Sequence, residues 1–196
     1  NKFISFEDGN NRNLLNEDGR NTLTIIHDGF AKLNNVNWKA AGVAIPVFSL
    51  RSKKSFGTGE FTDLKLLVDW AKSTGLKMIQ LLPVNDTTAT YTWKDSYPYS
   101  AISAFALHPL LLNLETVAGK EHASVVTALS SKKKQLNKLT SLDYEEVMKI
   151  KTAAIRELYA LQKESFRDDI MFMTFFEFNR HWLEPYAAFT YLRDKY

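Results

Sequence analysis

A short run of carboxylate, hydroxyl and aromatic side chains, Asp95-Ser96-Tyr97-Pro98-Tyr99-Ser100, contains the residues of this sequence best suited to bind a ligand. A sugar ring presents apolar C–H faces and a rim of hydroxyl groups, so aromatic platforms beside carboxylates and hydroxyls match its chemistry. The alternative is structural, with Tyr97 and Tyr99 packing the loop onto its domain and their hydroxyls bonded to the backbone. Residue types alone favour neither interpretation.

Two aspartates in this region, Asp86 and Asp95, have the chemistry of the carboxylate pair that glycoside cleavage requires. Nothing in the sequence fixes their separation, and structural aspartates are more common, so we assign no catalytic residue to this chain. The segment Gly57-Thr58-Gly59 lacks the further residues of a phosphate- or dinucleotide-binding loop and is interpreted as a turn. The histidines show no paired metal-ligand spacing, and His108 is predicted to be a hydrogen-bonded packing residue. We therefore predict neither a metal site nor a cofactor.

Composition narrows the classes of partner. The sequence has 196 residues, with 25 Lys and Arg against 22 Asp and Glu, and its net charge of +3 does not favour nucleic acid. The densest basic run, Lys132-Lys133-Lys134, is predicted to be a solvated helix face. No apolar run approaches the ~20 residues of a membrane helix, so we expect no membrane partner. The absence of cysteine fits the cytoplasm. Because the chain starts at Asn1 rather than Met, we expect it to come from a longer protein.

The first part of the chain has a different pattern from the rest. Residues 1–28 alternate short β-like segments with turns rich in Asn, Asp and Gly, which is typical of the end of an all-β module. Residues 29–39 are interpreted as a linker. Residues 40–114 then contain two apolar runs, 42–48 and 78–84, of the kind found in strands covered on both faces.

An amphipathic helix is predicted between the two apolar runs. Leu64, Leu67, Val68 and Ala71 have the spacing of one helical face, and Gly75 follows as a C-terminal stop. Strand, helix and strand in this order predict a βαβ unit with parallel strands and a right-handed crossover. The long loop 85–104 carries the aromatic run and is called the aromatic loop below. It would then lie at the carboxyl end of the second strand, where α/β barrels form their sites.

Residues 115–196 are predicted to form helices without an intervening strand, which we interpret as a helical insertion. Asp143 and Glu146 have the spacing of a capping box. Two further helices are predicted over 168–180 and 183–196. The apolar and aromatic residues at helical spacing in this region are expected to be core, namely Trp182, Tyr186, Phe189 and Leu192.

Several motifs are similar, in the same serial order, to those of a known enzyme family. They lie at 41–52, 57–61, 80–86, 95–100, 103–109 and 182–189. On these motifs the chain resembles the 4-α-glucanotransferases, also called amylomaltases or disproportionating enzymes, of glycoside hydrolase family 77. Its motifs at 46–52 and 95–100 are most similar to those of the long branch of that family, whose members carry starch-binding modules before the barrel. Residues 6–12 resemble the end of a family 20 starch-binding module, with Phe6 where tryptophan is usual.

The resemblance implies a fold and a division of the chain. Residues 40–114 would form the first β/α units of a (β/α)8 TIM barrel, and residues 115–196 a helical insertion subdomain. Residues 1–28 would be the end of the starch-binding module, followed by the linker of 29–39. The fold class expected is thus α/β, a partial TIM barrel with a helical subdomain and a short β tail.

The resemblance also implies an activity. Enzymes of this family transfer α-1,4-glucan segments between maltooligosaccharides by a retaining double displacement, without a cofactor. Their catalytic carboxylates lie in later barrel strands, for which this chain has no matching motif. Ser96 and Tyr99 match family positions near the scissile bond, and Asp95 and Tyr97 complete the predicted substrate-binding set.

A non-catalytic glucan-binding or scaffold domain is the alternative, in which the aromatic loop serves only to bind. A partial barrel would also leave an open strand edge and uncovered helix faces. We therefore expect the isolated chain to self-associate.

Overall fold

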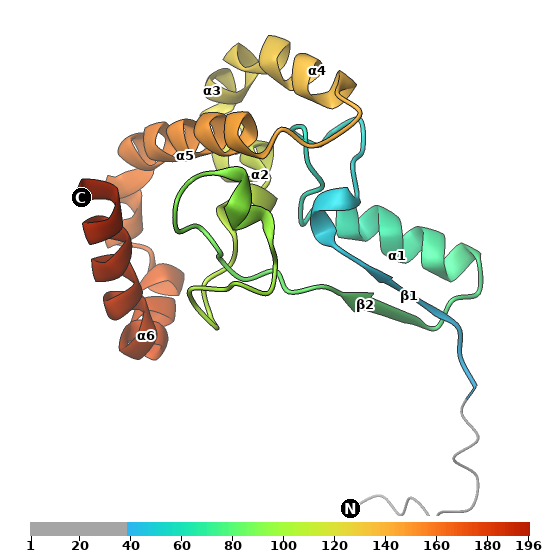
Figure 1. Cartoon of the computed structure of the whole chain (residues 1–196). Helices are drawn as coiled ribbons and strands as arrows, with labels where there is room; N and C mark the ends of the chain where they lie inside the picture. The colour runs from blue at the N-terminus through green and yellow to red at the C-terminus, as the bar shows by residue number, and fades with distance from the viewer. Residues whose placement is uncertain (1–38) are drawn as a thin grey trace, which may run out of the picture. The chain divides into compact units, whose positions relative to one another are not determined.

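The computed structural model describes residues 39–196. The predicted starch-binding tail, residues 1–28, and nearly all of the predicted linker, 29–39, lie outside the described residues. The described chain is α/β, with one small parallel sheet and a larger helical part (Figure 1). Among residues 39–196, no helix combines the length and the apolar composition needed to cross a lipid bilayer.

The predicted βαβ unit is present (Figure 1). Its elements are β1 (Gly42–Ile45), α1 (Asp63–Ser73) and β2 (Met78–Leu81). The strands pair in parallel, with Gly42 opposite Met78. Leu67 and Ala71 are buried in α1, as their spacing predicted, and Leu64 is half-buried. Val68, the fourth residue of the predicted apolar face, is instead 54% exposed, because nothing in the described chain covers that side of the helix. Gly75 has a φ of +77°, the left-handed conformation that glycine tolerates best, directly after the helix ends.

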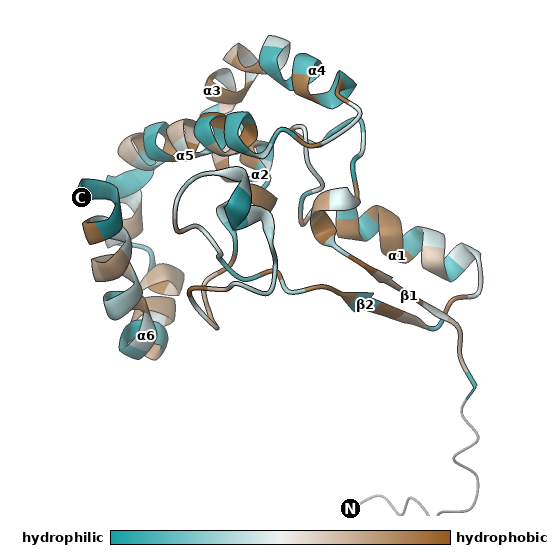
Figure 2. Cartoon of the chain, in the orientation of Figure 1, coloured by the Kyte–Doolittle hydropathy of each residue, from teal (hydrophilic) through white to brown (hydrophobic). Residues whose placement is uncertain are grey.

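The strands are shorter and less covered than predicted. The apolar runs 42–48 and 78–84 indicated strands covered on both faces, whereas no residue of β1 or β2 is buried. Within residues 39–196 each strand pairs only with the other, so both outer edges of the sheet are open. Pro46 and Pro83 limit the ladder, because proline has no backbone N–H to donate. The strand residues themselves are largely hydrophobic (Figure 2).

The helical part is organised around one long helix, α5. Its elements are α2 (Leu114–Ala118), α3 (Ala123–Ala128), α4 (Ser130–Lys138), α5 (Tyr144–Arg167) and α6 (Ile170–Lys195). The predicted cap of α5 is confirmed, because the Asp143 carboxylate accepts a hydrogen bond from the Glu146 backbone N–H at 3.0 Å. Val147 and Leu158 of α5 are fully buried in the core. Residues from the preceding loops and helices pack against them, including Phe56, Leu110, Leu114 and Leu136.

One continuous helix, α6, replaces the two predicted helices over 168–180 and 183–196. Asp169 caps its start, since the carboxylate accepts from the backbone N–H groups of Met171 and Phe172. The predicted gap contains no helix-breaking residue, and Pro185 is accommodated inside the helix.

The apolar stripe of α6 is not core, contrary to the prediction. Trp182 and Tyr186 are half-buried, while Phe189 and Leu192 are exposed. No described residue of α6 is buried. Within the described chain the helix contacts α5 and the loop after β2, which together cover only part of its surface. Helical spacing defines a face of a helix but not what covers that face.

A buried ion pair joins the loop after β1 to the helical part. The Lys151 side chain is 0% exposed and donates to Glu60 Oε1 at 2.5 Å. It also donates to the backbone oxygens of Leu110 and Leu112, at 2.7 and 2.8 Å. Asn113 donates to the second Glu60 oxygen at 2.6 Å. All three ammonium protons and both carboxylate oxygens therefore have partners.

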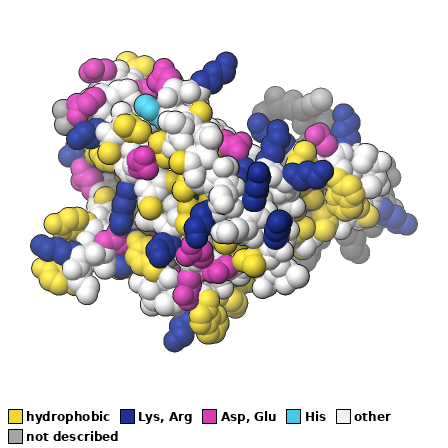
Figure 3. Space-filling model, turned by 90° about the horizontal axis from the view of Figure 1, so that it is seen from above, with side chains coloured by type: hydrophobic (Ala, Val, Ile, Leu, Met, Phe, Trp, Pro, Cys, Tyr) yellow, Lys and Arg dark blue, Asp and Glu magenta, His cyan; other side chains and the backbone are white. Residues whose placement is uncertain are grey.

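The basic run at 132–134 lies on α4, as predicted. Lys132 and Lys134 are exposed, and Lys133 pairs with Glu115 at 2.7 Å. One face of the molecule shows basic side chains interspersed with acidic and hydrophobic ones (Figure 3).

Candidate functional site

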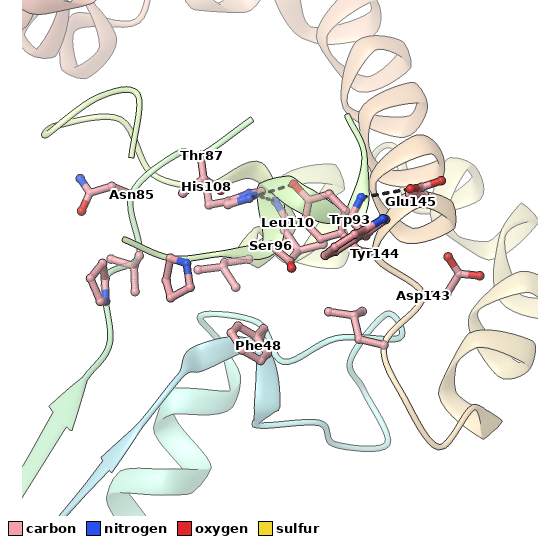
Figure 4. A pocket seen from close by; sticks show the side chains of 15 residues that line it. Phe48, Asn85, Thr87, Trp93, Ser96, His108, Leu110, Asp143, Tyr144 and Glu145 are labelled. Atoms are coloured by element: carbon pink, nitrogen blue, oxygen red, sulfur yellow. Dashed lines mark hydrogen bonds between the residues drawn. The ribbon is translucent and has the colours of Figure 1, made fainter. Parts of the chain in front are cut away.

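A cavity of about 390 Å³ lies between the segments that follow β1 and β2, the aromatic loop and the start of α5 (Figure 4). Phe48 lines it from the segment after β1, and Pro83 and Val84 from the segment directly after β2. Asn85, Thr87, Trp93 and Ser96 line it from the aromatic loop. It is therefore located at the carboxyl end of the parallel strands, the end at which the sequence predicted a site.

The cavity combines apolar walls with a few polar groups. Its apolar and aromatic lining comes from Phe48, Pro83, Val84, Trp93, Pro98, Leu110, Leu111, Leu142 and Tyr144. Its polar lining comes from Asn85, Thr87, Ser96, His108, Asp143 and Glu145. Small-molecule sites have this character, with apolar surface for contact area and a few polar groups for orientation. A ring with apolar faces and a hydroxyl rim matches the lining.

Asp95 lies beneath the loop surface and organises it. Its carboxylate accepts from the backbone N–H groups of Thr90 and Tyr91, at 2.8 and 2.6 Å, and from the Thr90 hydroxyl at 3.0 Å. The residue is only 4% exposed. Its backbone oxygen accepts a further hydrogen bond from the Thr87 hydroxyl. Asp95 is thus the centre around which the loop folds.

The other three predicted substrate-binding residues lie nearer the surface. Ser96 is exposed and lines the cavity. Tyr97 and Tyr99 are 59% and 61% exposed, with ring centroids 5.5 Å apart, and neither lines the cavity. Their exposure argues against the interpretation that they pack the loop onto its domain. They are free to offer aromatic surface beside the cavity rather than inside it.

Asp86 also has a structural environment. It is buried, and its carboxylate accepts from the Thr88 backbone N–H at 2.9 Å and from the Tyr186 hydroxyl of α6 at 2.5 Å. Burial, together with this hydrogen bond to Asp86, raises the pKa of Tyr186. Asp86 and Asp95 therefore both accept hydrogen bonds from protein groups, as expected of structural aspartates.

His108 is a hydrogen-bonded packing residue, as predicted, and it also lines the cavity. Its Nδ1 accepts from the Leu110 backbone N–H at 3.1 Å, and its Nε2 lies 3.2 Å from the Tyr144 hydroxyl (Figure 4). Burial lowers the pKa of His108, although the nearby Asp86 and Asp95 carboxylates oppose this shift. Burial likewise raises the pKa of Tyr144. Both side chains are therefore neutral at pH 7.

Sequence reasoning missed the contribution of α5 to the cavity. Asp143, which caps that helix, lines the cavity together with Tyr144 and Glu145 of its first turn. Glu145 Oε1 also accepts from the Trp93 backbone N–H at 3.0 Å, which ties the helix to the loop (Figure 4). The capping signal at Asp143 located the helix start but carried no information about what it faces. No group of three or more His, Asp or Glu side chains in residues 39–196 could hold a metal ion.

Comparison with known proteins supports the motif-based resemblance. A family model described as 4-alpha-glucanotransferase, glycoside hydrolase family 77, matches residues 45–196. The 4-alpha-glucanotransferase DPE2 of Oryza sativa subsp. japonica is 42% identical over 193 residues, which is 97% of this chain and 20% of the rice protein.

Bacterial relatives show the same similarity. The 4-alpha-glucanotransferase of Chlamydia muridarum (strain MoPn / Nigg) is 34% identical over 78% of this chain and 28% of its own length. That of Chlamydia pneumoniae is 37% identical over 76% of this chain and 27% of its own length. The chain thus spans between about a fifth and somewhat over a quarter of these relatives. With a family match over most of its residues, the chain belongs to glycoside hydrolase family 77.

Proposed function

We propose that the protein containing this chain is a 4-α-glucanotransferase, which transfers α-1,4-glucan segments between maltooligosaccharides. The observation that carries the proposal is the family match over residues 45–196, which includes every residue that lines the cavity. A retaining double displacement fits this function: a carboxylate attacks the anomeric carbon while a carboxylic acid protonates the leaving oxygen. A second glucan, rather than water, then accepts the sugar.

The aromatic loop would contribute substrate contacts. Ser96 offers a hydroxyl inside the cavity, and Tyr97 and Tyr99 offer exposed aromatic surface beside it. Asp95 would act from below, because its carboxylate holds the backbone of 90–91 in place. Its contribution to substrate binding is then the shape of the loop.

The catalytic carboxylates would lie outside this chain. Asp86 and Asp95, the two aspartates of the loop, are buried and already accept hydrogen bonds from protein groups. We propose that residues 40–114 form the first units of the family's barrel and residues 115–196 a helical insertion. Residues 1–28 and 29–39 would be the end of a starch-binding module and a linker. The cytoplasm, supported by the absence of cysteine, remains the proposed compartment.

Self-association of the isolated chain also remains a proposal. Ile170, Met171 and Phe178 of α6 are 76–78% exposed, and the sheet has open edges. Exposed apolar surface of this extent favours association. Sedimentation of the isolated chain over a range of concentrations tests this, and a monomer at every concentration would contradict it.

The activity is tested by incubating the full-length protein with maltotriose and separating the products by chain length. Glucose together with longer oligomers is the expected result. Release of glucose without longer products would indicate a hydrolase, and binding without any product would favour the non-catalytic glucan-binding domain.

Variants test the residues. Ser96→Ala and Tyr99→Ala should each lower kcat/KM about tenfold, since each loses a contact worth about 1.4 kcal/mol. Tyr159→Ala is the matched control, because Tyr159 is 61% exposed like Tyr99 but lies on α5 outside the cavity lining. Unchanged transfer kinetics in the Ser96 and Tyr99 variants would remove both residues from the substrate site.

A further inference from the structure

The last three turns of α6 hold the first half of the aromatic loop, although about 100 residues separate the two segments. Tyr186 donates to the Asp86 carboxylate at 2.5 Å. Arg193 donates from one nitrogen to the backbone oxygen of Thr88 at 2.5 Å and from the other to the Tyr91 hydroxyl at 2.7 Å. The two-pronged guanidinium thus joins two points of the loop that are three residues apart.

Tyr91 is the centre of this contact. Its hydroxyl accepts from Arg193 and donates to Asp194 Oδ1 at 2.7 Å, and the Arg193 guanidinium carbon lies 4.8 Å from the centre of its ring. The second Asp194 oxygen accepts from Arg156 of α5 at 2.9 Å. Two arginines, one aspartate and one tyrosine therefore form a single cluster that connects α5, α6 and the loop.

The charges of the cluster support one another. Partial burial of Asp194 would raise its pKa, but hydrogen bonds from Tyr91 and Arg193 together with the nearby arginine charges hold that pKa below its ordinary value. Burial and the hydrogen bond to Asp194 raise the pKa of Tyr91, so its hydroxyl keeps its proton. The Arg193 side chain is largely covered, which limits its screening by solvent.

The backbone of the loop needs such support. Tyr91 has a φ of 58° and is the only non-glycine residue with a positive φ in the described part of the chain. A bulky residue in this conformation persists when its surroundings over-determine it, and such residues cluster at functional sites. The Asp95 carboxylate fixes Tyr91 from inside the loop, and Arg193 and Asp194 fix it from α6.

This arrangement bears on the cavity because Trp93 and Ser96, which line it, follow Tyr91 within five residues. We propose that Arg193 is a positioning residue that holds the aromatic loop in its substrate-ready shape through Thr88 and Tyr91. The expected effect on KM rests on the proposed function, whereas the expected effect on the order of the loop does not. When Arg193 is absent, only a fraction of the molecules would have the loop in place, and the apparent affinity for the glucan would be reduced to that fraction of its original value.

The test uses the full-length protein with Arg193→Ala and, as control, Arg180→Ala. Arg180 lies on the same helix and makes an exposed ion pair with Glu184 rather than a loop contact. Arg193→Ala should raise KM for maltotriose about tenfold and leave kcat within about twofold, because the free energy of ordering the loop is then taken from the binding free energy. Amide exchange over residues 88–93 should become about tenfold faster. Arg180→Ala should change neither quantity.

A milder variant covers the case in which Arg193→Ala does not fold. Tyr91→Phe removes only the hydroxyl that accepts from Arg193 and donates to Asp194, and it should shift KM and amide exchange in the same direction by a smaller factor. If both changes act through one cluster, the double variant should be no worse than Arg193→Ala alone.

The outcomes separate the inference from the proposed function. Unchanged amide exchange over 88–93 in a folded Arg193→Ala variant, or a loss of kcat with KM unchanged, would overturn the positioning role. Absence of glucan transfer by the unmodified protein would instead overturn the proposed function, and the exchange experiment would still decide whether Arg193 holds the loop.

Discussion

Replacing Lys151 with methionine should be among the most destabilising single changes in the described chain. Methionine has a similar volume, so the change removes the ammonium without leaving a large cavity. Among residues 39–196, the Glu60 carboxylate, itself 1% exposed, then keeps only Asn113 as a hydrogen-bond partner. An uncompensated buried charge costs about 3–5 kcal/mol, and the two backbone oxygens that lose a donor add about 1 kcal/mol each, partly overlapping with it. We expect a loss of unfolding free energy of about 4–6 kcal/mol.

Urea unfolding followed by tryptophan fluorescence measures this loss. Lys133→Met is the matched control, because its ion pair with Glu115 lies at the surface, where the Glu115 side chain is 53% exposed. The control should cost at most about 1 kcal/mol. The double variant Lys151→Met with Glu60→Gln removes both charges, so it should recover about 2 kcal/mol relative to the sum of the single losses.

Two results would refute the reasoning. Lys151→Met could prove no more destabilising than Lys133→Met, which would mean that the Glu60 carboxylate is not left as an unpaired buried charge. The two single losses could instead add up fully in the double variant, which would mean that the side chains do not act as a pair. Because a typical domain has only about 5–15 kcal/mol of stability, a large loss should also appear as unfolded protein before urea is added.

Two further predictions concern pH and backbone shape. Burial lowers the pKa of His108 below its ordinary 6.5, so the unfolded chain takes up a proton before the folded chain does. The contribution of neutral His108 to the free energy of unfolding should therefore be fully present above pH 6.5 and should decrease as the pH drops below it, by up to about 1.4 kcal/mol per pH unit. Urea unfolding at a series of pH values measures this dependence, and His108→Asn should make it weaker below pH 6.5. Gly59→Ala would place its Cβ 2.0 Å from the Val47 backbone oxygen, so we expect a loss of about 3 kcal/mol or more. Gly75→Ala meets no atom within 4 Å and should cost only about 1 kcal/mol for its positive φ; equal melting temperatures for the two variants would contradict this.

Local patterns predicted local structure well. The apolar spacing of Leu64 to Ala71 placed the helix α1, Gly75 marked its end, and Asp143 marked the start of α5. In each case the residues that decide the outcome lie within a few positions of one another. Predictions that needed a distant neighbour failed, because strand coverage at 42–48 and the core role of the stripe from Trp182 depend on what packs against them.

The features of the candidate site also divide into those predicted by local sequence patterns and those that depend on distant neighbours. The sequence alone identified the family motifs and the βαβ order, and it predicted a site at the carboxyl end of the strands, where the cavity lined by Ser96 lies. Only the tertiary structure decided that α5 lines the cavity and that Lys151 meets Glu60 across 91 residues. It alone placed Arg193 against Tyr91 across 102 residues. Periodicity and caps act between near neighbours in the chain, whereas such contacts depend on how whole helices pack, which no short pattern encodes.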